Sequence, residues 1–145
     1  MNETISSYER NWAMCSHLLG LLIFTHIPFA NVIGPLVLYI QVRGEKMPFA
    51  TEHAKAALDF QITFSLAMIV WFIVGFAIVG AGVAALAVNG DRDPGPPLAL
   101  IAGLFVLVSL LLLGVLANVV CCILGAIAAS GGHRFRYPLA IPFVR

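Results

Sequence analysis

Apolar residues run almost without interruption through three regions of the chain, residues 11–42, 60–88 and 98–129. Each region reaches or exceeds the ~20 residues that an α-helix needs to cross the ~30 Å hydrocarbon core of a bilayer. The segment between the last two regions, residues 89–97, is dense in Asn, Gly, Asp and Pro, which favour turns. The pattern therefore predicts membrane-spanning helices that are joined by short loops.

The first region is too long for one crossing, because residues 11–42 as a single helix would measure ~48 Å. Pro28 and Pro35 also lie inside it, with Asn31 and Gly34 between them. Proline removes a backbone donor and clashes with the preceding helical turn. We therefore predict a hairpin, with one helix over about 11–27, a break that begins at Pro28, and a short second helix over about 33–43.

These elements define the expected fold class, which is all-α. We expect a polytopic transmembrane helical bundle in one domain, residues 1–145, with a proline-broken first hairpin. Its four membrane segments cover about 11–27, 33–43, 56–88 and 98–129, and a short interfacial C-terminal tail covers 133–145. Composition agrees, since 61% of the residues are hydrophobic and 10% are charged, against roughly 25% charged residues in soluble domains. The main partner is then the lipid bilayer, and a net charge of +1 gives no sign of nucleic-acid binding.

Charge placement predicts the orientation, because cytoplasmic loops collect Lys and Arg. With the hairpin, one side of the membrane holds Arg10, Arg43, Lys46, Lys55, Arg134, Arg136 and Arg145, and the other side holds Arg92. This distribution predicts a multi-pass protein of the bacterial inner membrane with both termini in the cytoplasm. A single first crossing fits the charges almost as well, so the hairpin depends mainly on the prolines.

The start of the second apolar region carries a polar face. Thr51 can cap a helix that begins there, with Glu52 in its first turn. Helical spacing then places Lys55 and Asp59 on one face, at the edge of the apolar stretch. We interpret Asp59 and Lys55 as an ion pair that seats the helix end at the interface. The alternative is the mouth of a hydrophilic passage.

The last apolar region carries Gly103, Gly114 and Gly125 at intervals of eleven residues, which places them on one helix face. Small residues let helices approach closely in lipid. We expect this face to pack against the preceding helix, and a homo-oligomer seam is the alternative. Asn118 lies deep in the same helix, where it can bond another helix or, alternatively, contact a solute.

Catalytic and metal-binding motifs are absent from the sequence. There is no G-x-S-x-G, H-E-x-x-H or glycine-rich phosphate loop. The three cysteines lie in apolar stretches without C-x-x-C spacing, and we expect Cys121 and Cys122 to pack as small apolar side chains. His17, His53 and His133 could converge on a metal or haem, but no ligand spacing supports this. We therefore predict no enzymatic activity, no cofactor and no metal.

The residues that could carry function lie at the hairpin break, at the polar helix start and in the last helix. They are Pro28, Asn31, Pro35, Glu52, His53, Lys55, Asp59, Gln61 and Asn118, with Gly103, Gly114 and Gly125 as helix-packing positions.

Four segments, residues 11–18, 27–36, 48–62 and 136–139, together resemble a bacterial family of small membrane proteins grouped with the chloroplast inner-envelope import component Tic-twenty. The resemblance implies four membrane helices and, by analogy, a link to protein translocation. We therefore expect a non-enzymatic interaction or translocation-related subunit, as a homo-oligomer or within a larger membrane complex. The alternative is a small pore or a proton/ion-coupled transporter that uses the broken hairpin and Asp59.

Overall fold

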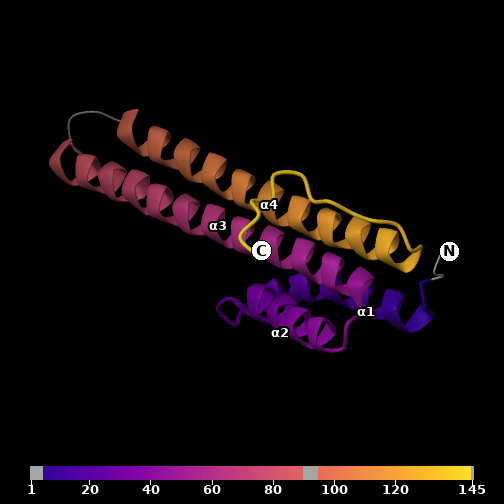
Figure 1. Cartoon of the computed structure of the whole chain (residues 1–145). Helices are drawn as coiled ribbons and strands as arrows, with labels where there is room; N and C mark the ends of the chain where they lie inside the picture. Colours follow the sequence, from indigo (N-terminus) through magenta and orange to yellow (C-terminus); the bar gives the residue numbers. More distant parts are fainter. Residues whose placement is uncertain (1–4, 90–94, 145) are drawn as a thin grey trace. The chain divides into compact units, whose positions relative to one another are not determined.

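The computed structural model describes residues 5–89 and 95–144, and every regular element in these ranges is a helix (Figure 1). The elements are α1 (Ser7–Leu18), the 3₁₀ helix η1 (Leu19–Thr25), α2 (Ala30–Gly44), α3 (Pro48–Asn89) and α4 (Gly95–Ser130). The predicted all-α class is confirmed. Most of the predicted loop at 89–97 lies outside the described residues.

The chain divides into two compact units. The first unit contains Met1–Ser65 and Asn118–Arg145, and the second contains Leu66–Ala117. The charged side chains that the structure describes all belong to the first unit, because residues 66–89 and 95–117 include no Asp, Glu, Lys or Arg. The two units are therefore chemically different, and each is described separately below.

The N-terminal hairpin of the first unit turns between Thr25 and Ala30. Ser6 caps α1 by accepting the backbone N–H of Glu9 at 3.1 Å. The turn that follows η1 contains two residues in the left-handed conformation, His26 (φ 60°) and Phe29 (φ 59°). Pro28 lies between them and disfavours helical backbone in the residue before it.

The second helix of the hairpin, α2, begins earlier than the sequence suggests. It starts at Ala30, so Pro35 lies inside it and is buried. The chain is therefore broken at Pro28 and not at Pro35. The cost of the missing proline N–H is confined to a single hydrogen bond within α2.

Helix α3 begins at Pro48, one turn before the predicted start at Thr51. Proline is favourable in the first turn, where its missing N–H has no helical partner. The Glu9 carboxylate of α1 accepts the N–H groups of Phe49 at 2.7 Å and Ala50 at 3.3 Å. The Thr51 hydroxyl instead donates to the Met47 carbonyl. A distant carboxylate thus caps α3, and the predicted Thr51 cap is wrong.

Helix α4 ends in a Schellman-type turn. Gly132 has φ 76°, and its N–H donates to the Ala129 carbonyl, while the N–H of His133 donates to the Ala128 carbonyl. The C-terminal tail, residues 133–144, then turns back along α4 (Figure 1).

The apolar core of the first unit collects side chains from α1, α2, α3 and α4. Its buried members are Ala13, Leu38, Tyr39, Val42, Phe49, Ala50, Ala54, Leu58 and Ala129. Many of them are small, which allows the helices to approach closely.

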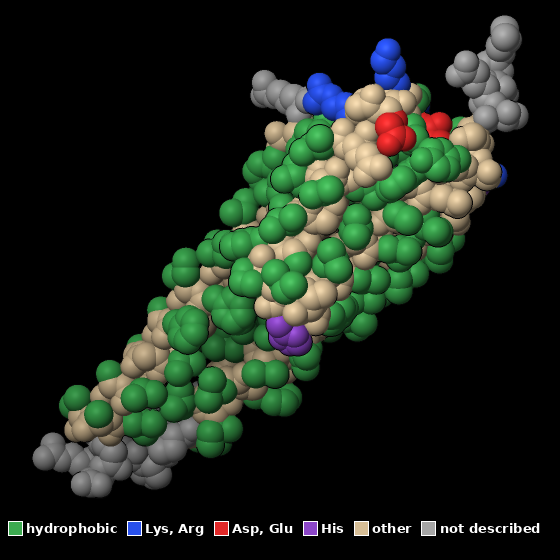
Figure 2. Space-filling model, turned by 90° about the horizontal axis from the view of Figure 1, so that it is seen from below, with side chains coloured by type: hydrophobic (Ala, Val, Ile, Leu, Met, Phe, Trp, Pro, Cys, Tyr) green, Lys and Arg blue, Asp and Glu red, His purple; other side chains and the backbone are tan. Residues whose placement is uncertain are grey.

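Two helical stretches are long and apolar enough to cross a membrane, Pro48–Val88 and Leu100–Ser130. Their most apolar windows are only 6% and 0% buried, whereas the core helix of a soluble protein would be mostly covered. Figure 2 shows hydrophobic side chains over most of the visible surface, with the Lys, Arg, Asp and Glu side chains gathered in one area. By contrast, α1 and α2 have only 12 and 15 residues. The structure therefore supports two spanning helices and does not establish four.

Candidate functional site

The first unit contains a buried polar cluster. We use this name for His17, Asn31, His53, Gln61, Ser65, Asn118, Cys122 and Tyr137. Except for the partly buried Ser65, these residues are at most 7% exposed. Buried polar groups cost free energy unless they are hydrogen-bonded, so their pairing determines what the cluster can do.

One half of the cluster is a chain of three rings. The Tyr137 hydroxyl lies 2.7 Å from Nδ1 of His17, and Nε2 of His17 lies 2.8 Å from Nδ1 of His53. Phe60 stacks on Tyr137, with ring centroids 4.1 Å apart and planes 8° apart. On the far side, Phe49 contacts His53 at a centroid distance of 4.5 Å.

The environment of Tyr137 keeps its hydroxyl neutral. Tyr137 lies outside the two apolar spans, and burial raises the pKa of its hydroxyl well above the ordinary range. The hydroxyl therefore keeps its proton, and the tautomers of His17 and His53 determine which group donates in each of the two bonds. Nε2 of His53 is buried without a hydrogen-bond partner among the described residues.

The other half is a network of amides and a thiol that joins α2, α3 and α4. Oε1 of Gln61 accepts from Nδ2 of Asn31 at 2.9 Å and from Nδ2 of Asn118 at 3.3 Å. Nε2 of Gln61 donates to the Cys122 sulfur at 3.3 Å, and that thiol lies 3.7 Å from Oδ1 of Asn118. Asn31 also donates to the Ser65 hydroxyl at 3.1 Å. Gln61 is thus the central residue of this network.

Two glycines make room for the cluster. A Cβ atom on Gly125 would lie 2.7 Å from Nδ1 of His17, and one on Gly20 would collide with the Gln61 amide and lie 2.9 Å from the Cys122 sulfur. Any larger residue at either position would displace a hydrogen-bonding group. These two glycines are therefore required by the polar side chains that face them.

The predicted glycine face behaves differently at each of its three positions. Gly125 is tightly packed, but a Cβ on Gly114 would make only an ordinary 3.7 Å contact with Met68, and one on Gly103 would meet nothing within 4 Å. Close packing at this face thus occurs inside the first unit and is not shared by Gly103.

Asp59 fastens the C-terminal tail to α3. Its Oδ1 accepts the backbone N–H groups of Phe143 and Val144, each at 2.9 Å, and one turn further along α3 the Thr63 hydroxyl accepts the N–H of Ile141 at 3.0 Å. The predicted Asp59–Lys55 ion pair is wrong. The ion pair found in the described part of the chain joins Arg134 of the tail to Glu52 at 3.3 Å.

The sequence candidates therefore separate into three groups. Asn31, His53, Gln61 and Asn118 meet in the buried polar cluster. Glu52 and Asp59 hold the tail, and Lys55 lies beside them. Pro28 is exposed at the hairpin turn. The hydrogen bonds of the described residues include one between the side chains of His17 and His53 and none from the His133 side chain to either.

Sequence reasoning missed several members of the cluster. His17 and Tyr137 are 120 positions apart, so no local spacing connects them. Cys122 takes part in the hydrogen bonds, and the expectation of a purely apolar role for it is wrong. Gly20 lies within an apolar stretch, and nothing in the sequence distinguished it from its neighbours. Tyr137 lies in the expected interfacial tail, 133–145, where nothing in the sequence indicated a buried contact.

The geometry of the cluster is that of a structural core. Its amides and rings bond one another across helices, and no group of three His, Cys, Asp or Glu side chains in residues 5–89 and 95–144 could hold a metal ion. The long apolar helices and this enclosed polar core define an all-helical membrane protein. The chain belongs to the magnetosome magnetite crystal formation protein family, MamF/MmsF, whose sequence pattern matches residues 8–144.

This assignment corrects the resemblance to the Tic-twenty-like family. The matching motifs recur along the chain, but the family match covering 8–144 is to MamF/MmsF. Motifs made of small, apolar and helix-breaking residues are common in membrane proteins of different families. They therefore indicated the wrong family here. The translocation role depended on that resemblance and has no other support. No curated protein and no solved structure matches the chain.

Proposed function

We propose that this protein is a multi-pass, non-enzymatic protein of the magnetosome membrane that takes part in magnetite crystal formation as an interaction subunit. The family match over residues 8–144 carries the proposal, because the description of the family names this process. The two uncovered apolar spans support a membrane location. In this role the first unit supplies a fixed scaffold, and its apolar surface is free to meet lipid, other subunits or further copies of the chain.

We place the N-terminal hairpin in the membrane as well. Helices α1 and η1 together extend about 32 Å, because a 3₁₀ helix rises faster per residue than an α-helix. The hairpin turn exposes Phe24, Ile27 and Phe29 by 55–62%, which favours lipid around it. Four segments would then keep both termini on the cytoplasmic side, where most of the basic residues lie.

The contacts favour an interaction role over a pore or a proton/ion-coupled transporter. Asp59 accepts two backbone N–H groups, and the cluster amides are used in bonds between helices. Two grooves in the described part of the second unit are lined by apolar side chains, glycine and one Trp. A transport path needs polar groups that are free to bind a solute.

A complementation experiment tests the proposed function. Deleting the gene in a magnetite-forming host should change crystal size or crystal number per cell, measured by electron microscopy, and the wild-type gene should restore both. Gln61→Leu, which removes the centre of the amide network, should fail to restore them. Gln41→Leu changes an exposed glutamine of α2 and should restore them fully. Crystals that are unchanged after deletion would refute the role.

A flux measurement addresses the transporter alternative directly. Purified protein in vesicles that enclose a pH-sensitive dye should show no proton flux above empty vesicles, in the wild type and in Asp59→Asn alike. Flux that is present in the wild type and absent in Asp59→Asn would replace the interaction role with proton-coupled transport.

A further inference from the structure

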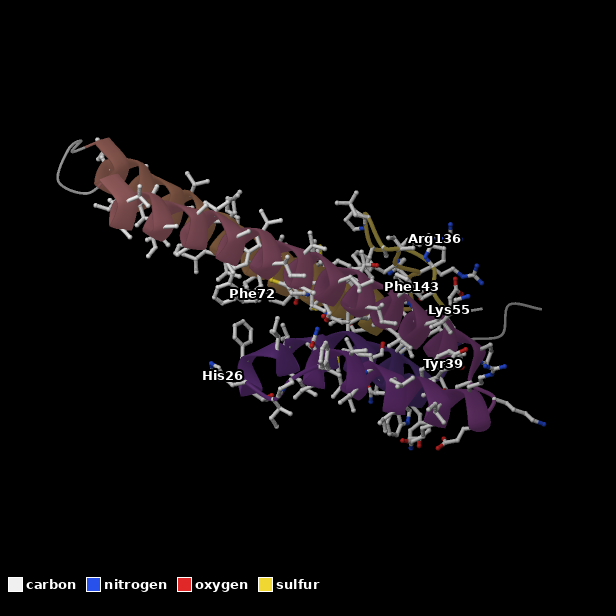
Figure 3. All side chains as sticks on the ribbon, turned by 90° about the vertical axis from the view of Figure 1, so that its left-hand side faces the viewer. His26, Tyr39, Lys55, Phe72, Arg136 and Phe143 are labelled. Atoms are coloured by element: carbon white, nitrogen blue, oxygen red, sulfur yellow. The ribbon has the colours of Figure 1, made fainter. Side chains whose placement is uncertain are left out.

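A pocket of about 370 Å³ lies between α3 and the C-terminal tail of the first unit. Glu52, Lys55 and Asp59 line it from α3, and Phe135, Arg136 and Tyr137 line it from the tail. Figure 3 shows Lys55 and Arg136 among the side chains where α3 and the tail meet. The wall is thus partly charged and partly aromatic.

The acids of this pocket already have partners, whereas two of its cations do not. Glu52 pairs with Arg134. Oδ1 of Asp59 holds the backbone of Phe143 and Val144. Within the described ranges, no carboxylate lies within ion-pair distance of Lys55 or Arg136. Lys55 and Arg136 are therefore the two charged groups of the pocket wall that are available to bind an anion.

The chemistry of the two cations indicates which anion. A guanidinium group binds phosphate oxygens through paired donors, and a lysine ammonium is a compact charge that binds phosphate well. The pocket also lies where α3 changes character, since no charged residue follows Asp59 until the end of the apolar span at Val88. In a membrane protein, the phosphates of phospholipids lie near such a boundary between charged and apolar sequence.

We propose that this pocket binds the phosphate group of a phospholipid headgroup, with Lys55 and Arg136 as its ligands. The aromatic wall formed by Phe135 and Tyr137 faces the glycerol part of the lipid, which inorganic phosphate lacks. A lipid bound there connects α3 to the tail, in addition to the bonds made by Asp59. The site does not depend on the role in crystal formation.

Native mass spectrometry on the delipidated full-length protein in detergent tests the site. Phosphatidylglycerol should bind the wild type, and Lys55→Gln and Arg136→Gln should each weaken binding at least tenfold, because each variant loses a hydrogen bond between charged partners. Lys46→Gln removes the same charge at the exposed turn between α2 and α3 and should bind as the wild type does. Equal binding by all four proteins would overturn the site.

Two further probes on the wild type identify the source of the phosphate without any variant. Diacylglycerol has the same acyl chains and no phosphate, so it should bind at least tenfold more weakly than phosphatidylglycerol. Millimolar inorganic phosphate should not displace the lipid. Equal retention of diacylglycerol would overturn phosphate recognition. Binding of inorganic phosphate with no retained lipid would overturn the lipid headgroup as the ligand.

Discussion

Gly125 and Gly20 show how single residues permit a polar core inside an apolar protein. Each glycine lies against a hydrogen-bonding side chain, His17 or Gln61, that has little room to move. In an apolar environment a displaced polar group loses its partner and cannot turn to water. At these two positions, the absence of a Cβ atom therefore stabilises the protein more than the higher helix propensity of alanine would.

Gly125→Ala should destabilise the protein because the new Cβ would lie 2.7 Å from Nδ1 of His17, which is hydrogen-bonded to Tyr137. Overpacking of this kind costs about 1–3 kcal/mol, and thermal unfolding in detergent measures it as a lower midpoint. Gly103→Ala is the matched control, because its Cβ would meet nothing within 4 Å. Its midpoint should stay the same or rise. Equal midpoints in the two variants would contradict the packing argument.

At the scale of elements, the start of α3 depends on a residue of α1. The Glu9 carboxylate accepts two of the N–H groups that the first turn of a helix leaves free, and its negative charge suits the positive end of the helix dipole. Ser6, which lies three residues before Glu9 in the chain, caps α1. The beginnings of two helices are therefore coupled through one short segment.

Glu9→Ala should loosen the first turn of α3 and lower stability by about 0.5–2 kcal/mol, the range for loss of a helix cap. Hydrogen exchange should become faster at the amides of Phe49 and Ala50, which lose their acceptor. Glu45→Ala is the control, because it removes an exposed carboxylate that accepts a 3.3 Å hydrogen bond from Gln41. Hydrogen exchange at the start of α3 should not change in this variant. Identical exchange in both variants would exclude capping by Glu9.

The elements also show what the sequence can and cannot predict. The apolar lengths of residues 60–88 and 98–129 correctly predict two long helices, because the thickness of a bilayer determines length without reference to neighbours. The cap of α3 was not predictable, since Glu9 lies 40 positions from Phe49. Asn31, Gln61 and Asn118 were each visible as polar residues in apolar stretches. Their mutual bonds depend on how three helices pack.

At the scale of the whole molecule, polar and apolar functions are separated along the chain. The described charges and the buried polar cluster belong to the first unit, and the described part of the second unit presents almost only apolar side chains. Such a division suits a protein in which one unit is held together by hydrogen bonds and the other is held mainly by lipid. The number of membrane crossings then depends on the N-terminal hairpin.

Cysteine labelling decides between a hairpin that crosses the membrane and one that does not. In a background without Cys15, Cys121 and Cys122, with serine at position 122 to preserve a polar group, single cysteines are introduced by Asn2→Cys, His26→Cys, Lys46→Cys and Asp91→Cys. With both termini cytoplasmic, an impermeant thiol reagent on the opposite face should label only His26→Cys and Asp91→Cys. The reason is that α1 with η1 extends about 32 Å, enough to carry the exposed turn at His26 through the ~30 Å core.

Labelling of Asn2→Cys together with Asp91→Cys would instead mean a single first crossing. Labelling of Asp91→Cys alone would mean a hairpin that returns before reaching that face, as the shorter α2 would favour.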